Sequence, residues 1–421
     1  MVQSVINRYI FGLLVFTLVF AILLYNLIGF DFTDEICALG LFALFFYTVL
    51  KSSDWAFNKA FLITLTVFAF YTCYSFRIGS NVPRAIVNDL VIQMKPYLAF
   101  FCVYHLKPCL NSVHKKLLRE TALLCWFLFL LPIGVTSLAY PRIFIVMMEH
   151  ISYFGIAVSL VSLCYLYGSS FTLRNKIIFL ALLSLGLLCG RSKFYGFFTV
   201  AVFVVFFFSK PEYFKIKFKN ILILLSMTGV VVLVAWRKIA YYFVNPVIGA
   251  GDMDPDLIVR LVLYYTMPQV LHDYFPFGSG FSSYATYSSG AWYSDLYVEY
   301  GLDNVWGMSK SYSGFISDAY YPCLAQFGVV GIGLFVWFWV YVIRKAFRLY
   351  RQGGPAGSIA VLFLIAGFLI IEETTASTLI AQGGFFVMML MGLILSEMKQ
   401  ATKPIKVNDS PSYREEKIRG C

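Results

Sequence analysis

Long apolar runs alternate with short polar segments along almost the whole chain. An α-helix needs about 20 residues to cross a hydrocarbon layer about 30 Å thick. Runs of roughly this length predict twelve membrane-spanning helices, over residues 9–29, 35–50, 57–76, 87–106, 120–139, 150–168, 173–189, 194–209, 220–236, 321–342, 358–372 and 378–396. We therefore expect an all-α, polytopic integral membrane protein in which residues 1–421 form one membrane domain.

One long stretch, residues 237–320, interrupts the series of apolar runs. It contains eight acidic residues, four basic residues and nineteen Phe, Tyr or Trp residues. Ordering a loop costs roughly 1 to 2 kcal/mol per residue in backbone entropy, and structureless loops of this length are usually functional. We expect the candidate functional residues to lie mainly in this long loop.

Composition and charge support this interpretation and orient the chain. The protein is 60% hydrophobic and 13% charged, which excludes a water-soluble fold of this length. Its net charge of +11 comes largely from the short loops, as in membrane topology and not as in nucleic-acid binding. A cytoplasmic N-terminus places 23 of the 33 basic residues on the cytoplasmic side. The long loop then faces outward, which in a bacterium means the periplasm, and we expect residues 399–421 to form a disordered cytoplasmic tail.

Motifs of common cofactor sites are missing from the sequence. It has no Cys-x-x-Cys pair, no His at ligand spacing, no Walker motif and no Gly-x-Gly-x-x-Gly turn after a strand. We therefore expect no metal ion, no cofactor and no ATP-driven transport.

A cationic turn, Gly-Arg-Ser-Lys at residues 190–193, joins two apolar runs at their outward ends. Its Arg191 and Lys193 run against the positive-inside rule. A guanidinium can hold a phosphate through two parallel hydrogen bonds, but long cationic side chains also extend towards lipid headgroups. A phosphate-ligand site and headgroup contacts both remain open for this turn.

A second candidate is an amphipathic surface helix that begins near Asp254 and that Pro268 ends or kinks. Arg260 and Tyr264 lie on one face of this helix. An ion pair between Arg260 and Asp256, four residues earlier, would contribute only about 0.3 to 0.5 kcal/mol. We favour a lipid phosphate or diphosphate as the partner of Arg260.

A glycine turn and a run of aromatic residues follow in the long loop. Gly278 and Gly280 permit positive φ and a close backbone approach to a substrate. Aromatic rings, Trp292 among them, could stack on sugar rings, and an interfacial aromatic belt is the competing interpretation. The aromatic residues are Tyr284, Tyr287, Trp292, Tyr293, Tyr297, Tyr300 and Trp306.

Asp318 lies where the long loop meets the next apolar run. A carboxylate in a cavity there could act as a general base, although an Asp just before a helix is more often its N-cap. Tyr321 is a further candidate for substrate binding.

Several other polar residues lie inside or beside the apolar runs. Asp89 and Lys95 fall within the fourth run, where ionisable groups should pair or line a path. His150, which begins the sixth run, could reach a site, but we expect it to be a solvated interfacial side chain. Glu372 and Glu373 close an outward end, and we expect them to be solvated too.

Together these stretches resemble the O-antigen polymerase and O-antigen ligase family of bacterial surface-polysaccharide enzymes. The resemblance covers about residues 176–341 and the overall number of spans. Its motifs, in order, are the Gly-Arg turn at 190–191, Arg260 opening the surface helix, the Pro-x-Gly-x-Gly turn at 276–280, and a polar and aromatic entry at Asp318 followed by Phe-Gly-x-x-Gly at 327–331.

The resemblance implies metal-independent glycosyl transfer at the periplasmic face of the bacterial inner membrane. The donor would be an oligosaccharide linked to undecaprenyl diphosphate, with Arg191 and Arg260 holding the diphosphate and Lys193 assisting. Membrane lipid, a chain-length regulator and a flippase would be its partners.

One departure from the family pattern bears on the subtype. Ligases of the family commonly carry a His-Asn type pair near the end of the long loop, where this chain has Asp318 and Ala319. The resemblance therefore favours a polymerase of O-antigen, capsule or exopolysaccharide, in which Asp318 orients or deprotonates the acceptor hydroxyl. A ligase that transfers the chain to lipid A core and a flippase or transporter of lipid-linked oligosaccharide are the alternatives.

Overall fold

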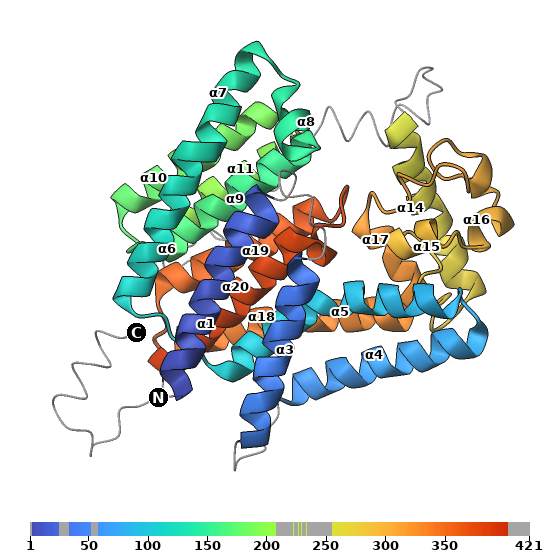
Figure 1. Ribbon diagram of the computed structural model, residues 1–421, viewed down its shortest axis with the longest axis horizontal. Coiled ribbons are helices and arrows are strands. Elements are labelled where there is room, and N and C mark those ends of the chain that lie inside the picture. The colour runs from blue at the N-terminus through green and yellow to red at the C-terminus, as the bar shows by residue number, and fades with distance from the viewer. Residues whose placement is uncertain are drawn as a thin grey trace.

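The protein is multi-pass and all-α in the parts that can be described. The computed structural model describes residues 2–24, 33–51, 58–207 and 255–402, with four isolated residues between the last two ranges. These ranges contain helices and no β-strand (Figure 1). Seven helices in them are long and apolar enough to cross a membrane: Gln3–Leu23, Thr33–Lys51, Lys59–Ile78, Pro83–Leu106, Ser112–Ala139, Tyr320–Arg351 and Gln382–Ala401. Shorter apolar helices cover Ile151–Tyr167, Ser192–Phe206 and Ala356–Glu372.

These helices confirm the predicted all-α membrane fold, although the number of spans stays a prediction. Eleven of the twelve predicted segments coincide with helices. The remaining segment, 220–236, lies almost entirely outside the described residues. The first part of the long loop and the tail from residue 403 onward also lie outside them.

One group of helices packs around α20 (Gln382–Ala401). It contains α1 (Val2–Phe16) with η1 (Thr17–Leu23), α3 (Thr33–Lys51), α5 (Pro83–Leu106) and α18 (Gly328–Arg351), and α4 (Lys59–Ile78) packs on α5 at its edge. Small residues bring transmembrane helices close together. A Cβ at Gly392 of α20 would lie 2.5 Å from the Phe100 carbonyl oxygen of α5, so the glycine permits this close packing.

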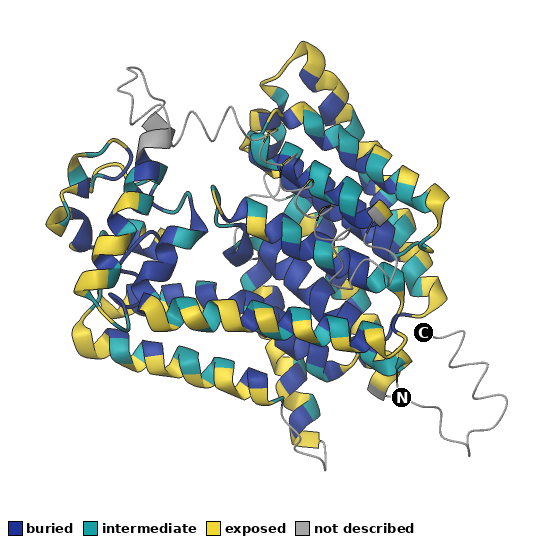
Figure 2. Cartoon of the chain, turned by 180° about the vertical axis from the view of Figure 1, so that it is seen from behind, coloured by how far each residue is buried: buried dark blue, intermediate teal, exposed yellow. Residues whose placement is uncertain are grey.

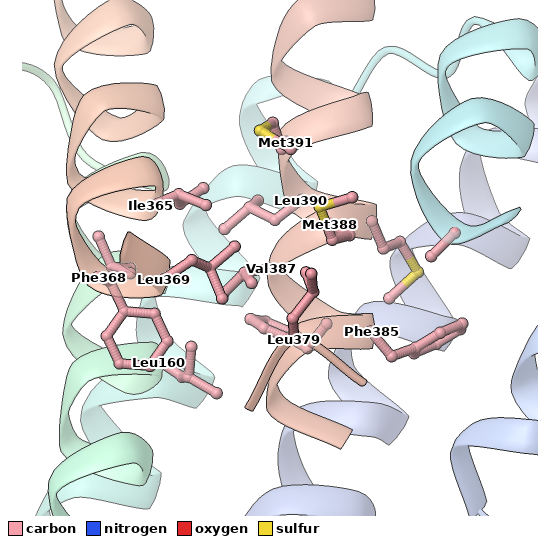
Figure 3. Packing of buried hydrophobic residues seen from close by; sticks show 14 of the residues in the cluster. Leu160, Ile365, Phe368, Leu369, Leu379, Phe385, Val387, Met388, Leu390 and Met391 are labelled. Carbon is pink, nitrogen blue, oxygen red and sulfur yellow. The ribbon is translucent and has the colours of Figure 1, made fainter. Parts of the chain in front are cut away.

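A second group of helices packs around α9 (Ile151–Tyr167), which is buried along most of its length. This group contains α6 (Ser112–Cys125), η2 (Trp126–Leu130), α7 (Leu131–Ala139), α8 (Ile143–Met148), α10 (Leu173–Ser184), η3 (Leu185–Cys189) and α11 (Ser192–Phe207). α19 (Ala356–Glu372) joins the two groups, because it contacts α9, α11 and α20. Figure 3 shows their packed side chains, including Leu160, Phe368 and Leu390.

The outer helices expose apolar side chains, as lipid-facing surfaces require. In the most apolar 18-residue stretch of α4, only 17% of the residues are buried. Exposed positions also follow helices along the edge of the molecule (Figure 2). α18 likewise exposes Val329, Val336 and Trp337. These faces fit a bilayer and not water.

Residues 255–319 form a compact unit over the N-terminal half of α5 (Figure 1). It contains α14 (Pro255–Asp273), α15 (Tyr287–Ala291), α16 (Leu296–Glu299) and η6 (Leu302–Asn304), and it leads into α17 (Tyr320–Cys323) and η7 (Leu324–Phe327). The Tyr284 hydroxyl donates to the Leu263 carbonyl (2.7 Å), and the Tyr297 hydroxyl accepts from the Ala285 amide (2.8 Å). Both tyrosines are fully buried and build the interior of the unit.

Polar side chains of α5 and the α4–α5 turn tether this unit to the membrane helices. Asp89 accepts from the Ser282 amide (2.7 Å), and the Asn81 amide donates to the Ser282 and Trp292 carbonyls (2.8 Å each). Asp89 is fully buried. Ionisable groups in this run were expected to pair, and Asp89 pairs with the backbone of the loop and not with Lys95.

Candidate functional site

A cavity of about 1870 Å³ lies where the two helix groups and the 255–319 unit meet. Its wall is formed by η1, α3, α5, the start of α9, the start of α11, α14, α17 and the segment between α19 and α20. Seven of the nine predicted site residues line this cavity: Arg191, Lys193, Arg260, Tyr264, Trp292, Asp318 and Tyr321.

Arg191 lies in the turn before α11 and faces His150, the N-cap of α9. Arg191 Nη2 is 3.2 Å from His150 Nε2, and His150 Nδ1 is 3.2 Å from the Ser152 amide nitrogen. No carboxylate lies within ion-pair distance of Arg191 among the described residues. His150 is exposed as expected, but it lines the cavity and does not simply face the membrane interface.

Lys193 is held by a carboxylate from α19. Its ammonium lies 2.6 Å from Glu372 Oε2, and the two side chains are 11% and 3% exposed. Glu373 is also buried and accepts from the Leu379 amide (2.7 Å). The expectation that Glu372 and Glu373 are solvated was wrong, because the α19–α20 segment folds over both. Burial raises the pKa of Glu373 well above its ordinary value.

Arg260 and Asp318 form an ion pair across the 255–319 unit. Arg260 Nη2 lies 2.7 Å from Asp318 Oδ2. The N-cap of α17 is Ala319, without a capping side chain, so the alternative that Asp318 caps a helix was wrong. The competing partner of Arg260, Asp256, has no described side chain. Arg260 Nε is buried and has no hydrogen-bond acceptor among the described residues.

These residues give one end of the cavity a positive field. Partial desolvation, followed by repulsion from Arg191, Lys193 and Arg260, lowers the pKa of His150 to about 4. That imidazole is therefore neutral at pH 7. Arg191, Lys193 and Arg260 face the paired carboxylates Glu372 and Asp318, and the Glu149 carboxylate beside His150 also lines this cavity. Guanidinium and ammonium groups at such a site suit an anionic ligand.

Two tyrosines bond the α14 and α17 sides of the cavity to the last turn of α19 and the segment after it. The Tyr264 hydroxyl donates to the Thr374 carbonyl (2.9 Å), and the Tyr321 hydroxyl donates to the Ile370 carbonyl (3.0 Å). Arg260 and Tyr264, which were predicted to share a face of this helix, both line the cavity. α14 continues through Pro268 to Asp273, so the proline does not end the helix, and the kink expected as its alternative stays a prediction.

Aromatic side chains line another part of the wall. Tyr287, Trp292, Tyr312 and Phe315 face the cavity, and the Arg84 guanidinium lies 5.8 Å from the Trp292 ring centroid. The sequence could not separate these rings from the buried ones that support the 255–319 unit. Both aromatic classes follow the same local pattern.

A buried charge cluster lines a third part of the cavity. The Lys95 ammonium of α5 pairs with Asp34, and it lies 2.7 Å from Glu35 Oε1 of α3. Lys95 and Asp34 are 4% and 1% exposed. The sequence singled out Lys95 but missed its partners, which lie about 60 residues earlier at the start of another apolar run.

Gly278 and Gly280 are not among the cavity-lining residues. Both have φ near +80°, and a Cβ at Gly278 would collide with the backbone of Gly328. The Gly280 amide donates to the Gln326 carbonyl (2.8 Å), and the Tyr74 hydroxyl donates to the Gly278 carbonyl (2.9 Å). The structure therefore gives this turn a packing role between α4 and α18, away from the predicted substrate site.

The part of the chain that the structure describes contains no group of three or more His, Cys, Asp or Glu side chains that could hold a metal ion. A scan of protein-family models and a search of curated proteins both find no match to the chain.

Proposed function

We propose that the protein is a glycosyltransferase of the bacterial inner membrane that joins oligosaccharide repeats carried on undecaprenyl diphosphate. The observation that carries this proposal is a shared cavity. It is lined by Arg191, Lys193 and Arg260, which come from two distant parts of the chain, and by Asp318. The motifs that resemble the O-antigen polymerase and ligase family contain three of these four residues.

The cation cluster suits a diphosphate leaving group. In the proposed step the acceptor hydroxyl oxygen attacks the anomeric carbon of the donor sugar, and the bond from that carbon to the diphosphate breaks. The electron pair stays on the diphosphate oxygen, where Arg191, Lys193 and Arg260 stabilise the developing charge. The hydroxyl proton passes to the Asp318 carboxylate.

The aromatic wall suits the sugar rings of the substrates. Trp292 and Tyr287 line the same cavity as the cation cluster. The Asn81 amide of the α4–α5 turn donates to the Trp292 carbonyl, and the Asn88 amide of α5 donates to the Ser288 hydroxyl. Flat apolar ring faces favour contact with the apolar faces of sugars, while the diphosphate stays at the cationic end.

The direct test replaces Arg191 or Arg260 with Ala and follows the glycolipid ladder in the native host. Loss of one such contact should lower the rate by roughly 10² to 10³, so chains should stop at one repeat while the protein still inserts. Arg142→Ala is the matched control, because Arg142 is an exposed arginine that does not line the cavity. Normal chain lengths in the Arg191 and Arg260 variants would refute their assigned roles.

Deletion of the gene separates the polymerase from the ligase. A single repeat on the surface glycolipid, with the ladder gone, would establish a polymerase. Long chains that accumulate on undecaprenyl diphosphate, with no capped lipopolysaccharide, would establish a ligase. We favour the polymerase because Asp318 and Ala319 replace the ligase His-Asn pair.

One observation favours a second candidate, a flippase or transporter of the same lipid-linked repeats. Buried ionisable residues along a membrane path are typical of transporters, and the Lys95, Asp34 and Glu35 cluster lines the cavity. Deletion of a flippase would trap unextended repeats on the cytoplasmic side. An unchanged glycolipid profile would remove both candidates.

A further inference from the structure

His150 and Arg191 bring two hydrogen-bond donors to one point in the cavity wall. His150 is the N-cap of α9, and its Nδ1 lies 3.2 Å from the Ser152 amide nitrogen. Its other ring nitrogen, Nε2, lies 3.2 Å from Arg191 Nη2. A neutral imidazole has one N–H group and one lone pair, so only one of these contacts can be a hydrogen bond.

The contact with Ser152 decides which nitrogen carries the proton. The Ser152 amide belongs to the first turn of α9, where amides have no intrahelical acceptor, and its direction is fixed by the helix. The Arg191 guanidinium is at the end of a long side chain and can rotate towards the cavity. Nδ1 therefore accepts from Ser152, and Nε2 carries the proton. The Nε2–H and the Arg191 N–H groups cannot bond to each other.

We propose that the His150 Nε2–H and Arg191 together bind oxygens of one phosphate group. This proposal rests on the proposed function, which supplies the phosphate as the diphosphate of the lipid-linked donor. Lys193 and Arg260 already have carboxylate partners, whereas Arg191 has none among the described residues. An anion here would satisfy both donors. A neutral imidazole adds a hydrogen bond without adding a fourth positive charge to the cluster.

Two substitutions separate phosphate binding from helix capping. His150→Asn keeps an acceptor at the position of Nδ1, and Asn is among the best N-cap residues, but it removes the Nε2 donor. His150→Gln places an amide nitrogen near the position of Nε2 and weakens the cap. His272→Asn is the matched control, because His272 is 88% exposed on α14 and does not line the cavity.

Binding of undecaprenyl diphosphate to the full-length protein in phosphatidylcholine nanodiscs is the assay, with the melting temperature measured for each variant. Loss of a hydrogen bond to a charged group weakens binding about 10- to 100-fold. We expect this loss in His150→Asn at an unchanged melting temperature, and we expect near wild-type affinity in His150→Gln and His272→Asn. Wild-type affinity in His150→Asn would overturn the proposal, as would an equal loss of affinity in the Asn and Gln variants.

A phospholipid headgroup offers the same phosphate chemistry, so the titration is repeated in nanodiscs that contain phosphatidylglycerol. If phosphatidylglycerol competes with an affinity equal to that of undecaprenyl diphosphate, the proposed function is refuted. In that case the His150→Asn variant would still test the donor, because the phosphatidylglycerol competition should weaken by the same factor. Weaker competition by phosphatidylglycerol in the wild-type protein would support the diphosphate as the ligand.

Discussion

Replacing Glu372 with Gln tests whether a buried ion pair supports the cation cluster. Lys193 and Glu372 are 2.6 Å apart and 11% and 3% exposed. Removing one partner of a buried pair costs about 3 to 5 kcal/mol, because the other charge stays buried. Lys193 also lines the cavity, where water can reach it, so we expect the lower value, about 3 kcal/mol. With an unfolding entropy of about 2.1 cal/mol/K per residue over 421 residues, the melting temperature should fall by about 3 °C.

Thermal unfolding of purified protein in detergent, followed by tryptophan fluorescence, measures this change. The double variant Lys193→Met with Glu372→Gln should recover most of the loss, because neither charge is then left alone. Glu120→Gln is the control, since the Lys116–Glu120 pair is 3.7 Å long and 66% and 50% exposed and should contribute at most about 0.5 kcal/mol. An unchanged melting temperature in Glu372→Gln, or purely additive effects in the double variant, would refute the buried pair.

Three further predictions concern Gly278, the Lys95 cluster and His150. Gly278→Ala should lose about 1 to 3 kcal/mol more than Gly301→Ala, because both glycines have positive φ but only Gly278 abuts backbone; denaturant unfolding measures the difference, and equal losses would contradict the packing role. Lys95→Met should lower the melting temperature strongly, because it leaves the Asp34 and Glu35 carboxylates unpaired, whereas Asp34→Asn should lower it only slightly, because Lys95 keeps Glu35. A larger fall in Asp34→Asn than in Lys95→Met would contradict the cluster. The pKa of His150 falls from 6.5 to about 4 on folding, so between these pH values the unfolded protein binds more protons than the folded protein. The wild type should therefore lose stability relative to His150→Asn as the pH falls from 6.5 to 4, and parallel pH profiles of the two melting temperatures would contradict this.

Local pattern predicted the helices and part of the site. Apolar run length is enough to place a helix, because every backbone group in lipid must be bonded within its own segment. Arg191 stood out because a cation at an outward span end runs against the charge rule, and Arg260 stood out because it lies on one face of a predicted surface helix. The structure brings both to one cavity with Asp318.

The partners of these residues were beyond prediction from the sequence. Glu372 pairs with Lys193 across nearly 180 residues, and Asp34 pairs with Lys95 across about 60. A carboxylate at the end of an apolar run looks solvated in the sequence, and only the fold of the segment after it decides its burial. The charged neighbours of His150, which is exposed as expected, were equally out of reach, since Arg191, Lys193 and Arg260 come from distant parts of the chain.

The ion pair between Arg260 and Asp318 connects the two halves of the proposed reaction. Arg260 Nη2 donates to Asp318, while Arg260 Nε is buried and has no acceptor among the described residues. A guanidinium has five N–H donors in a planar fork, so one arginine can hold a diphosphate oxygen and keep the carboxylate. In the proposed reaction Arg260 would therefore stabilise the leaving group and position Asp318 towards the acceptor hydroxyl in the same complex.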